Sequence, residues 1–512
     1  MHLKNLTIKK LIEKYKEISL LGKVKAVLDW DLNVNLPQKG SEGRARQSAY
    51  ITELVVNKWL DPEFRKILDQ ANNESNLLLE EKAILRNINY SGKYYLKVPK
   101  EIIIEKEKTA SEAFMSWQEA KKQDKFVDFL PYLSKIIELS RIVADHLGYK
   151  DNPYDALLDL FEPELTAKFT EEKFSKIKPA LTKLLIKIRK SKKYQSPLNF
   201  VNGQLNYPIE SQKQLSLFVA KKSGYDLNAG RIDVSAHPFT TALDRFDVRI
   251  TTMYKALDLR SSFTSTMHET GHAIYEQGIN EDYSETPLEF GVSMGIHEAM
   301  SRFWENQVGR NPNFLKFLRP VFQAFYPEQL GQVGDETLVK LFNWVEPGFI
   351  RIEADEVTYS LHIILRFEIE KALINKKLKP KDLPEVWRAK MKQLFAITPK
   401  TDREGVLQDV HWSYGAFGYF PSYALGNLYA AQLLAKMKQE LDVENLLLQG
   451  NLDTIRFWLK DNIYQYGSLY LPLELIKKAT NEELNPKYFI DYINKKYTQI
   501  FGGYFKETSF KN

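Results

Sequence analysis

The chain has 512 residues, of which 44% are hydrophobic and 27% charged, a balance typical of a globular protein with a large core. It contains no cysteine, which excludes disulfide bonds, thiolate metal ligands and cysteine nucleophiles. Its 72 basic and 66 acidic side chains leave a net charge of +6, and because the two signs are interspersed along the chain, the charge predicts no nucleic-acid partner.

The N-terminal segment MHLKNLTIKKLIEKYKE interleaves lysine and glutamate with apolar residues, which predicts an amphipathic helix. It lacks the continuous apolar stretch of a signal peptide. No other segment approaches the roughly 18 apolar residues of a membrane-spanning helix. We therefore expect a cytoplasmic protein that makes no membrane contact.

Most of the chain shows apolar residues at three- and four-residue spacing, which predicts a mainly helical fold. The clearest examples are residues 80–96, 132–147, 171–190 and 425–441. There is no repeat of fixed period and no long linker, so we expect one domain over residues 1–512. The stretch 196–208, rich in Pro, Asn, Gly and Gln, is the best candidate for a subdomain boundary.

One strand is predicted, in the segment RFDVRITTMY at residues 245–254. Apolar residues with β-branched members alternate there with polar ones at a period of two. The strand comes just before the segment TSTMHETGHAIYEQG, residues 264–278, in which the chemistry of the sequence is concentrated.

This second segment holds two of the eight histidines of the chain, His268 and His272. It is predicted to be a helix that is capped by Ser261 or Ser262 and ends at Gly278 in the left-handed conformation. Residues four apart lie on one face of a helix, so the two imidazoles can bind one Zn²⁺ ion at about 2.0–2.1 Å. The alternative is a solvent-facing helix with two incidental histidines.

Glu269 projects about 100° further round this helix, where it can hold and deprotonate a metal-bound water. The motif is therefore the H-E-x-x-H signature of a metallohydrolase. Gly271 lies inside the helix, at a cost of about 1 kcal/mol relative to alanine, which predicts that another element packs closely there.

A catalytic zinc ion needs three protein ligands and an open position. The third histidine of the metzincin motif is absent, and Tyr275 stands where that motif has glycine. The next predicted helix, residues 291–310, carries His297 and Glu298. We expect Glu298 to be the third ligand, with a simple ion pair to Arg302 as the alternative. We expect His297 to line the site, with a place in the core as the alternative.

The segment FIRIEADEVTYSLHIILRF, residues 349–367, is predicted to be a single apolar helix. On such a helix Arg351, Asp355, Thr358 and His362 would form one polar stripe facing an aqueous groove. A buried Arg351–Asp355 pair is the alternative. Asp355 could also orient a ligand histidine, as carboxylates behind metal sites do.

Six motifs occur in a fixed order: HPF (237–239), DVRIT (247–251), HETGH (268–272), IHEA (296–299), IRIEAD (350–355) and GVLQDVHW (405–412). Together with LDWDLNVNLP (28–37) and FGYFPSYALGN (417–427), they resemble the M32 family of metallocarboxypeptidases, the thermostable carboxypeptidase 1 group, over nearly the whole chain. One departure is Ala299, where the family usually has serine.

The resemblance implies a gluzincin-type, all-α fold with helices around a deep central substrate groove and a small β-sheet beside the active site. It also implies a homodimer, a dependence on Zn²⁺ or Co²⁺, and the release of single amino acids from the C-termini of peptides. The catalytic motifs would span residues 237–423. His268, His272 and Glu298 would bind the metal ion, and Glu269 would activate its water.

A carboxypeptidase must recognise the free α-carboxylate of its substrate, which a fixed arginine binds through two hydrogen bonds. The resemblance favours Arg351 for this role, with Arg249 as its rival and His237 as a further substrate-binding residue. By similarity to other helical zinc peptidases, His411 and Tyr423 would stabilise the oxyanion. Packing within an aromatic core is the alternative for these two side chains.

The predicted strand at 245–254 has two interpretations, an ordinary hairpin and an exposed edge that pairs with the backbone of an extended peptide. The second would give broad specificity, because side chains are not read, and poor handling of a C-terminal proline. Two alternative functions are an oligopeptidase that cleaves short peptides internally and a non-catalytic peptide-binding protein. The presence of Glu269 argues against the latter, because binding needs no general base.

Overall fold

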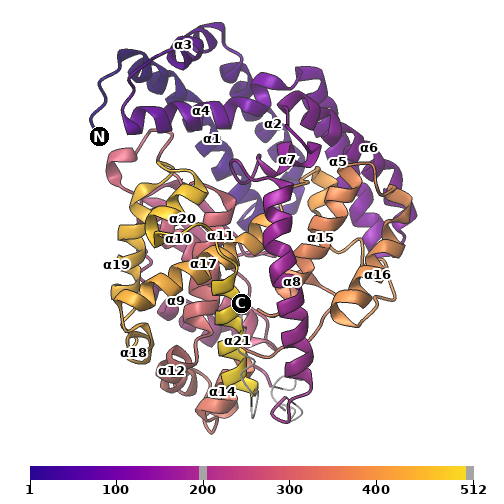
Figure 1. Ribbon diagram of the computed structural model, residues 1–512, viewed down its shortest axis with the longest axis vertical. Helices are drawn as coiled ribbons and strands as arrows, with labels where there is room; N and C mark the ends of the chain where they lie inside the picture. The colour runs from indigo at the N-terminus through magenta and orange to yellow at the C-terminus, as the bar shows by residue number, and fades with distance from the viewer. Residues whose placement is uncertain (195–204, 503–512) are drawn as a thin grey trace. The chain divides into compact units, whose positions relative to one another are not determined.

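The structure, a computed structural model, describes residues 1–194 and 205–502. It consists mainly of helices (Figure 1), and it also contains one small sheet. Unit 1 comprises Met1–Ile104, Tyr207–Gly309 and Glu440–Glu483. Unit 2 comprises the described parts of Glu105–Asn206, Arg310–Gln439 and Leu484–Asn512. The predicted boundary at 196–208 lies largely outside the described residues.

The helices of unit 1 form an N-terminal group, a central group that carries the HETGH motif, and a C-terminal group. They are α1 (Leu6–Val34), α2 (Ser41–Trp59), α3 (Pro62–Asn72), α4 (Leu79–Lys97), α9 (Ile209–Ser223), α10 (Leu259–Gln277), α11 (Met294–Arg302), α18 (Val443–Leu448), α19 (Leu452–Asn462) and α20 (Pro472–Thr480). Short 3₁₀ turns are η1 (Gln38–Gly40), η2 (Glu281–Tyr283) and η7 (Tyr464–Tyr466), and η3 (Phe303–Gly309) is a π-helix.

The sheet also belongs to unit 1 and has three strands, β1 (Gly230–Val234), β2 (Thr240–Asp244) and β3 (Asp247–Thr252), in the order β1-β3-β2. β1 pairs with β3 in parallel, and β2 pairs with β3 as an antiparallel hairpin. Both β2 and β3 contact α10. The predicted strand and the small sheet beside the HETGH helix are therefore confirmed.

The prediction of an exposed edge in the DVRIT strand is wrong, because β3 is the central strand of the sheet. Val248 and Ile250 are fully buried, as the alternation predicts, whereas Phe246 lies outside the strand and is 55% exposed. The backbone groups of β3 are paired on both sides, so they cannot pair with a peptide. An edge next to α10 is provided by β2.

Unit 2 has helices and loops but no strand among its described residues. Its helices are α6 (Phe126–Leu147), α7 (Pro153–Leu158), α8 (Ala167–Arg189), α12 (Pro312–Phe325), α13 (Pro327–Leu330), α14 (Asp335–Phe342), α15 (Tyr359–Ile374), α16 (Leu383–Phe395) and α21 (Lys487–Phe501), with most of α5 (Lys100–Gln123) and α17 (Pro421–Glu440). Its 3₁₀ turns are η4 (Arg351–Glu353), η5 (Pro380–Asp382) and η6 (His411–Tyr414).

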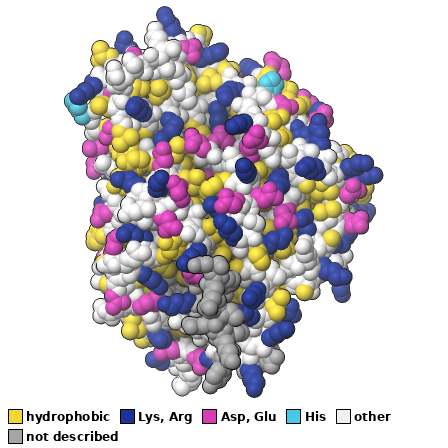
Figure 2. All heavy atoms as spheres, in the orientation of Figure 1, with side chains coloured by type: hydrophobic (Ala, Val, Ile, Leu, Met, Phe, Trp, Pro, Cys, Tyr) yellow, Lys and Arg dark blue, Asp and Glu magenta, His cyan; other side chains and the backbone are white. Residues whose placement is uncertain are grey.

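The four segments predicted from helical periodicity are confirmed as α4, α6, α8 and α17. Among the helices of the described ranges, none combines the length and the apolar character that crossing a bilayer requires. Basic and acidic side chains are interspersed on the face drawn in Figure 2.

Candidate active site

Helix α10 carries the HETGH motif and begins one turn earlier than predicted. Its N-cap is Asp258, whose carboxylate accepts a hydrogen bond from the backbone N–H of Arg260, so Ser261 and Ser262 lie inside the first turn. The predicted left-handed end is also wrong, because Gly278 has a φ of −85°. Gly278 therefore has a right-handed helical conformation.

Close packing at Gly271 is confirmed. A Cβ atom there would lie 2.7 Å from the carbonyl oxygen of Met300 and 2.7 Å from the Cα of Ser301. Both atoms belong to the backbone of α11, so the absence of a side chain lets α10 and α11 approach each other. This approach brings the HETGH motif next to the second helix of the site.

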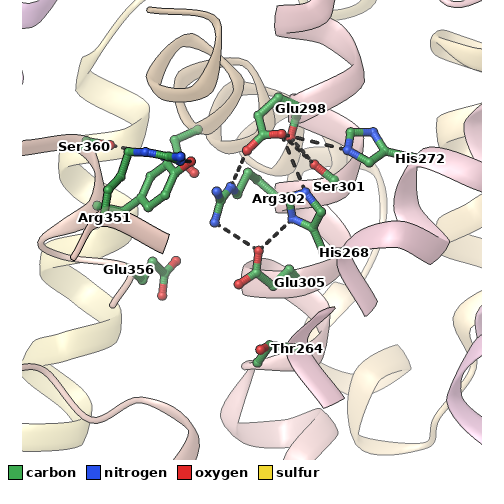
Figure 3. Close-up of polar contacts among 12 residues, drawn as sticks. Thr264, His268, His272, Glu298, Ser301, Arg302, Glu305, Arg351, Glu356 and Ser360 are labelled. Carbon is green, nitrogen blue, oxygen red and sulfur yellow. Dashed lines mark hydrogen bonds and ion pairs between the residues drawn. The ribbon is translucent and has the colours of Figure 1, made fainter. Parts of the chain in front are cut away.

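His268, His272 and Glu298 form a group whose possible ligand atoms all lie within 4.8 Å of one another. Glu298 Oε2 is 3.7 Å from His268 Nε2 and 3.9 Å from His272 Nε2 (Figure 3). Two imidazole nitrogens and one carboxylate oxygen suit a divalent ion such as Zn²⁺. The group therefore fits a metal ion, with the carboxylate supplied by a second helix as in gluzincins.

Each imidazole of this group is oriented through its Nδ1 atom. His268 Nδ1 lies 2.9 Å from Glu305 Oε2, and His272 Nδ1 lies 3.2 Å from Nδ1 of His297, whose Nε2 is 2.5 Å from Glu276 Oε1. These contacts are satisfied when each ligand histidine donates from Nδ1. The lone pair of each Nε2 atom is then available to a metal ion.

Glu305 and Glu276 were not predicted from the sequence, where Asp355 was one of the alternatives for this orienting role. The carboxylate of Asp355 instead accepts hydrogen bonds from Glu346, Val357 and Thr358. A signal was present, since Glu276 follows His272 by four residues and Glu305 follows Glu298 by seven, which is about two helical turns.

Glu269 is 5% exposed and lies on α10 beside the first strand residue of β2. The hydroxyl of Thr240 donates to Glu269 Oε2 at 2.7 Å, which orients the carboxylate. Burial raises the pKa of Glu269 above its ordinary value. The arrangement suits a group that exchanges protons during a reaction.

Burial also lowers the pKa of His272 well below its ordinary value, which favours the neutral imidazole that metal ions bind. For His268 burial acts in the same direction, but the carboxylates of Glu298 and Glu305 outweigh it and raise the pKa. The carboxylates around His268 therefore favour a positive charge at this candidate metal group, which a cation can supply.

The predicted helix over 349–367 is wrong in its first half. Arg351 belongs to the 3₁₀ turn η4, and α15 begins only at Tyr359, because the carboxylate of Asp355 holds the intervening turn by accepting backbone hydrogen bonds. The polar stripe therefore does not exist as one helical face. His362 lies buried in α15 instead, with its ring 4.4 Å from that of Phe395.

Arg351 is buried in unit 2, where its Nε and NH2 donate to Asp409 Oδ1 at 3.0 and 2.9 Å. Arg366 donates to Oδ2 of the same carboxylate at 2.7 Å. Although burial raises the pKa of Asp409, the two guanidinium groups hold it below its usual range. Two arginines therefore share one carboxylate.

The two predicted oxyanion residues lie in the same part of unit 2. The guanidinium carbon of Arg351 is 5.2 Å from the centroid of the Tyr423 ring, and the rings of His411 and Tyr423 are 6.5 Å apart. Burial, with a further contribution from Arg351, lowers the pKa of His411 to about 4. His411 is therefore neutral at pH 7.

The other two predicted substrate-binding residues lie in unit 1. Arg249 pairs with Asp247 through two hydrogen bonds of 2.7 Å, and its guanidinium lies 4.7 Å from the ring centroid of Trp30. His237 is exposed between β1 and β2, and its carbonyl accepts a hydrogen bond from Ser235 Oγ at 2.6 Å. The fork of Arg249 is thus already occupied by a carboxylate.

The helical fold and the group on α10 and α11 define a metallopeptidase of the H-E-x-x-H class. The chain belongs to the carboxypeptidase Taq (M32) metallopeptidase family, whose model matches residues 10–497, and it is a metallocarboxypeptidase.

Similar proteins cover nearly the whole chain. Thermostable carboxypeptidase 1 of Pyrococcus furiosus is 40% identical over 96% of this chain and 99% of its own length. Carboxypeptidase 1 of Bacillus subtilis is 40% identical over 96% of this chain and 98% of its own. A solved structure of the Pyrococcus furiosus carboxypeptidase superposes with a TM-score of 0.93 at 40% identity, covering 96% of this chain and 99% of that one.

Proposed function

We propose that this chain is a zinc-dependent carboxypeptidase that releases single amino acids from peptide C-termini with broad specificity. The proposal is carried by one observation, the convergence of His268, His272 and Glu298 within 4.8 Å. Zn²⁺ suits these donors, and Co²⁺ accepts the same ones. When bound, the ion supplies a Lewis acid that lowers the pKa of a water molecule and polarises the scissile carbonyl.

Glu269 acts as the general base and then as the proton carrier. One of its oxygens, Oε2, accepts the hydrogen bond of Thr240, which leaves Oε1 to accept the proton of the attacking water. It takes a proton from that water and delivers it to the leaving amine. Its burial keeps the carboxylate away from bulk water, which would otherwise compete for the proton.

Arg351 binds the α-carboxylate of the substrate in this proposal. It shares Asp409 with Arg366, so the two guanidinium groups exceed the one carboxylate by one positive charge, which a substrate carboxylate can neutralise. His411 and Tyr423 stabilise the oxyanion by hydrogen bonding. His237 and Arg249 contribute to peptide binding at the sheet.

We further propose that the protein works in the cytoplasm as a homodimer, on peptides and not on nucleic acids or membranes. The family likeness supports the homodimer and the peptide substrates, and the interspersed charges of the chain argue against a nucleic-acid partner. Light scattering at several protein concentrations measures the assembly state, and a mass of one chain at all of them would contradict the dimer.

The first experiment separates metal binding from catalysis. The Glu269→Gln variant should bind one zinc ion per chain, measured by elemental analysis, and should lose at least about 100-fold in kcat on a blocked dipeptide. His268→Ala should lose both metal and activity. Unchanged turnover by Glu269→Gln would remove the proposed mechanism.

The second experiment compares peptides that differ only at their C-terminus. Amidation should abolish cleavage, whereas an oligopeptidase that cuts internally would retain it. Arg351→Ala should lower kcat/KM on free C-termini by about 100-fold, the loss expected for a charge-assisted pair of hydrogen bonds. Arg249→Ala tests the rival residue, and a larger loss in that variant would transfer the role to Arg249.

A further inference from the structure

Arg302 lies between the two carboxylates that surround the candidate metal group. Its Nε donates to Glu298 Oε1 at 2.6 Å, and its NH1 donates to Glu305 Oε2 at 3.0 Å (Figure 3). The side chain of Arg302 is 12% exposed and those of Glu298 and Glu305 are 5% and 8% exposed. The three charged groups therefore interact where water screens them little.

The two oxygens of Glu298 consequently have different surroundings. Oε1 is held by the guanidinium, whereas Oε2 lies 3.7 Å from His268 Nε2 and 3.9 Å from His272 Nε2. A free carboxylate can present both oxygens to a cation. The charge-assisted hydrogen bond from Arg302 holds one oxygen back, so only Oε2 is turned toward the imidazoles.

The NH1 group of Arg302 contacts His268 indirectly, through Glu305. Glu305 Oε2 accepts from Arg302 NH1 and also contacts His268 Nδ1 at 2.9 Å, which leaves Nε2 of that histidine directed at Glu298 Oε2. Glu305 lies on the π-helix η3, a form that is frequent at functional sites. One planar, five-donor side chain thus orients two members of the group.

An arginine at this position works against tight metal binding, because it places a positive charge beside a divalent cation. Beyond neutralising the charge of Glu298 and Glu305, it contributes a fixed geometry. A lysine would carry the same charge but could not hold two carboxylates in a fixed fork.

We propose that Arg302 is a positioning residue that restricts Glu298 to one metal-facing oxygen and so keeps a coordination position free for water and substrate. The proposal rests on the metal role of His268, His272 and Glu298 proposed above. It adds that Arg302, and not Glu298 alone, determines how many oxygens of Glu298 can bind the metal ion.

Co²⁺ bound to the protein tests this, because its visible absorption weakens as its coordination number rises. Arg302→Met should bind one Co²⁺ per chain with an affinity equal to wild type or up to about 10-fold tighter, since a repelling charge is lost. Its absorption should be weaker, and its kcat should fall at least about 10-fold. Arg302→Lys should show the same weaker band, because the fork is lost even though the charge remains.

The matched control is Arg260→Met, which removes an arginine paired with Asp258 at the start of α10 and should leave the Co²⁺ spectrum unchanged. A wild-type spectrum in both Arg302 variants would overturn the proposal and leave Arg302 as an ordinary ion-pair residue. If instead His268→Ala still bound Co²⁺ as wild type does, the metal site itself, and with it the proposed function, would fail.

Discussion

The contact at Gly271 makes the relation between packing and metal binding measurable. A methyl group added there would meet two backbone atoms of α11 at 2.7 Å, the carbonyl oxygen of Met300 and the Cα of Ser301. Backbone atoms cannot rotate away as a side chain can, so the Gly271→Ala variant must separate α10 from α11. The separation moves Glu298 relative to His268 and His272.

The expected effect on stability combines two opposing terms. Alanine gains about 1 kcal/mol over glycine inside a helix. Overpacking a tight interior costs about 1–3 kcal/mol, and two backbone contacts below 3 Å place this site at the upper end. The net loss should be about 2 kcal/mol. Metal affinity should fall about 10-fold or more, as it does when the groups that orient ligands are disturbed.

Gly22 in α1 offers the control, because a Cβ atom there would have nothing within 4 Å. Gly22→Ala should therefore stabilise the chain by up to about 1 kcal/mol and leave metal affinity unchanged. Urea unfolding in the presence of a chelator measures the first quantity, and competition with a chromophoric chelator measures the second. If Gly271→Ala were as stable as Gly22→Ala and bound zinc as tightly as wild type, the argument from close packing would be wrong.

Three further substitutions test residues within one unit or the other. Because the pKa of His411 is about 4 in the folded chain and about 6.5 when unfolded, the unfolded chain takes up this proton first as the pH falls. Between pH 7 and 4 the free energy of unfolding of the wild type should therefore fall by up to about 3 kcal/mol more than that of His411→Asn. Urea unfolding at several pH values measures it, and an equal fall in the two proteins would contradict this. Glu276→Gln should weaken zinc affinity about 10-fold, because Glu276 contacts His297, which orients His272. Glu281→Gln, at an exposed site of the same unit, should leave the affinity unchanged. Equal zinc affinities of the two variants would show that Glu276 does not orient His272 through His297. Thr240→Val should lower kcat about 10-fold without changing metal content or KM, and Thr240→Ser should restore it; a Thr240→Ser variant as slow as Thr240→Val would show that the hydroxyl is not the cause.

Local periodicity accounts for the part of the molecule that could be predicted from the sequence. The spacing of His268 and His272 puts both imidazoles on one face in any α-helix, whatever surrounds it. The same holds for the apolar periods of α4, α6, α8 and α17, and for the alternation of Val248 and Ile250 in β3. These features depend on neighbours a few residues away, which the sequence displays directly.

Two features were predicted less well, for different reasons. The extended helix over 349–367 failed because a local side chain competes with the apolar period: the carboxylate of Asp355 accepts backbone hydrogen bonds from Val357 and Thr358 and so stabilises a turn. The position of β3 at the centre of the sheet depends on β1, which pairs with it in parallel from another part of the chain. Hydrophobic pattern alone does not distinguish a central strand from an edge.

The residue types of the candidate metal group, the helices that carry them and the family of the protein can all be read from the order of the amino acids. Which atom of each residue meets which depends on how the helices pack. The approach of α11 to Gly271, the contact of His297 with His272 and the contact of Glu305 with His268 each join residues of different helices. Such contacts follow from the fit of one helix surface against another, and no periodicity within either helix encodes that fit.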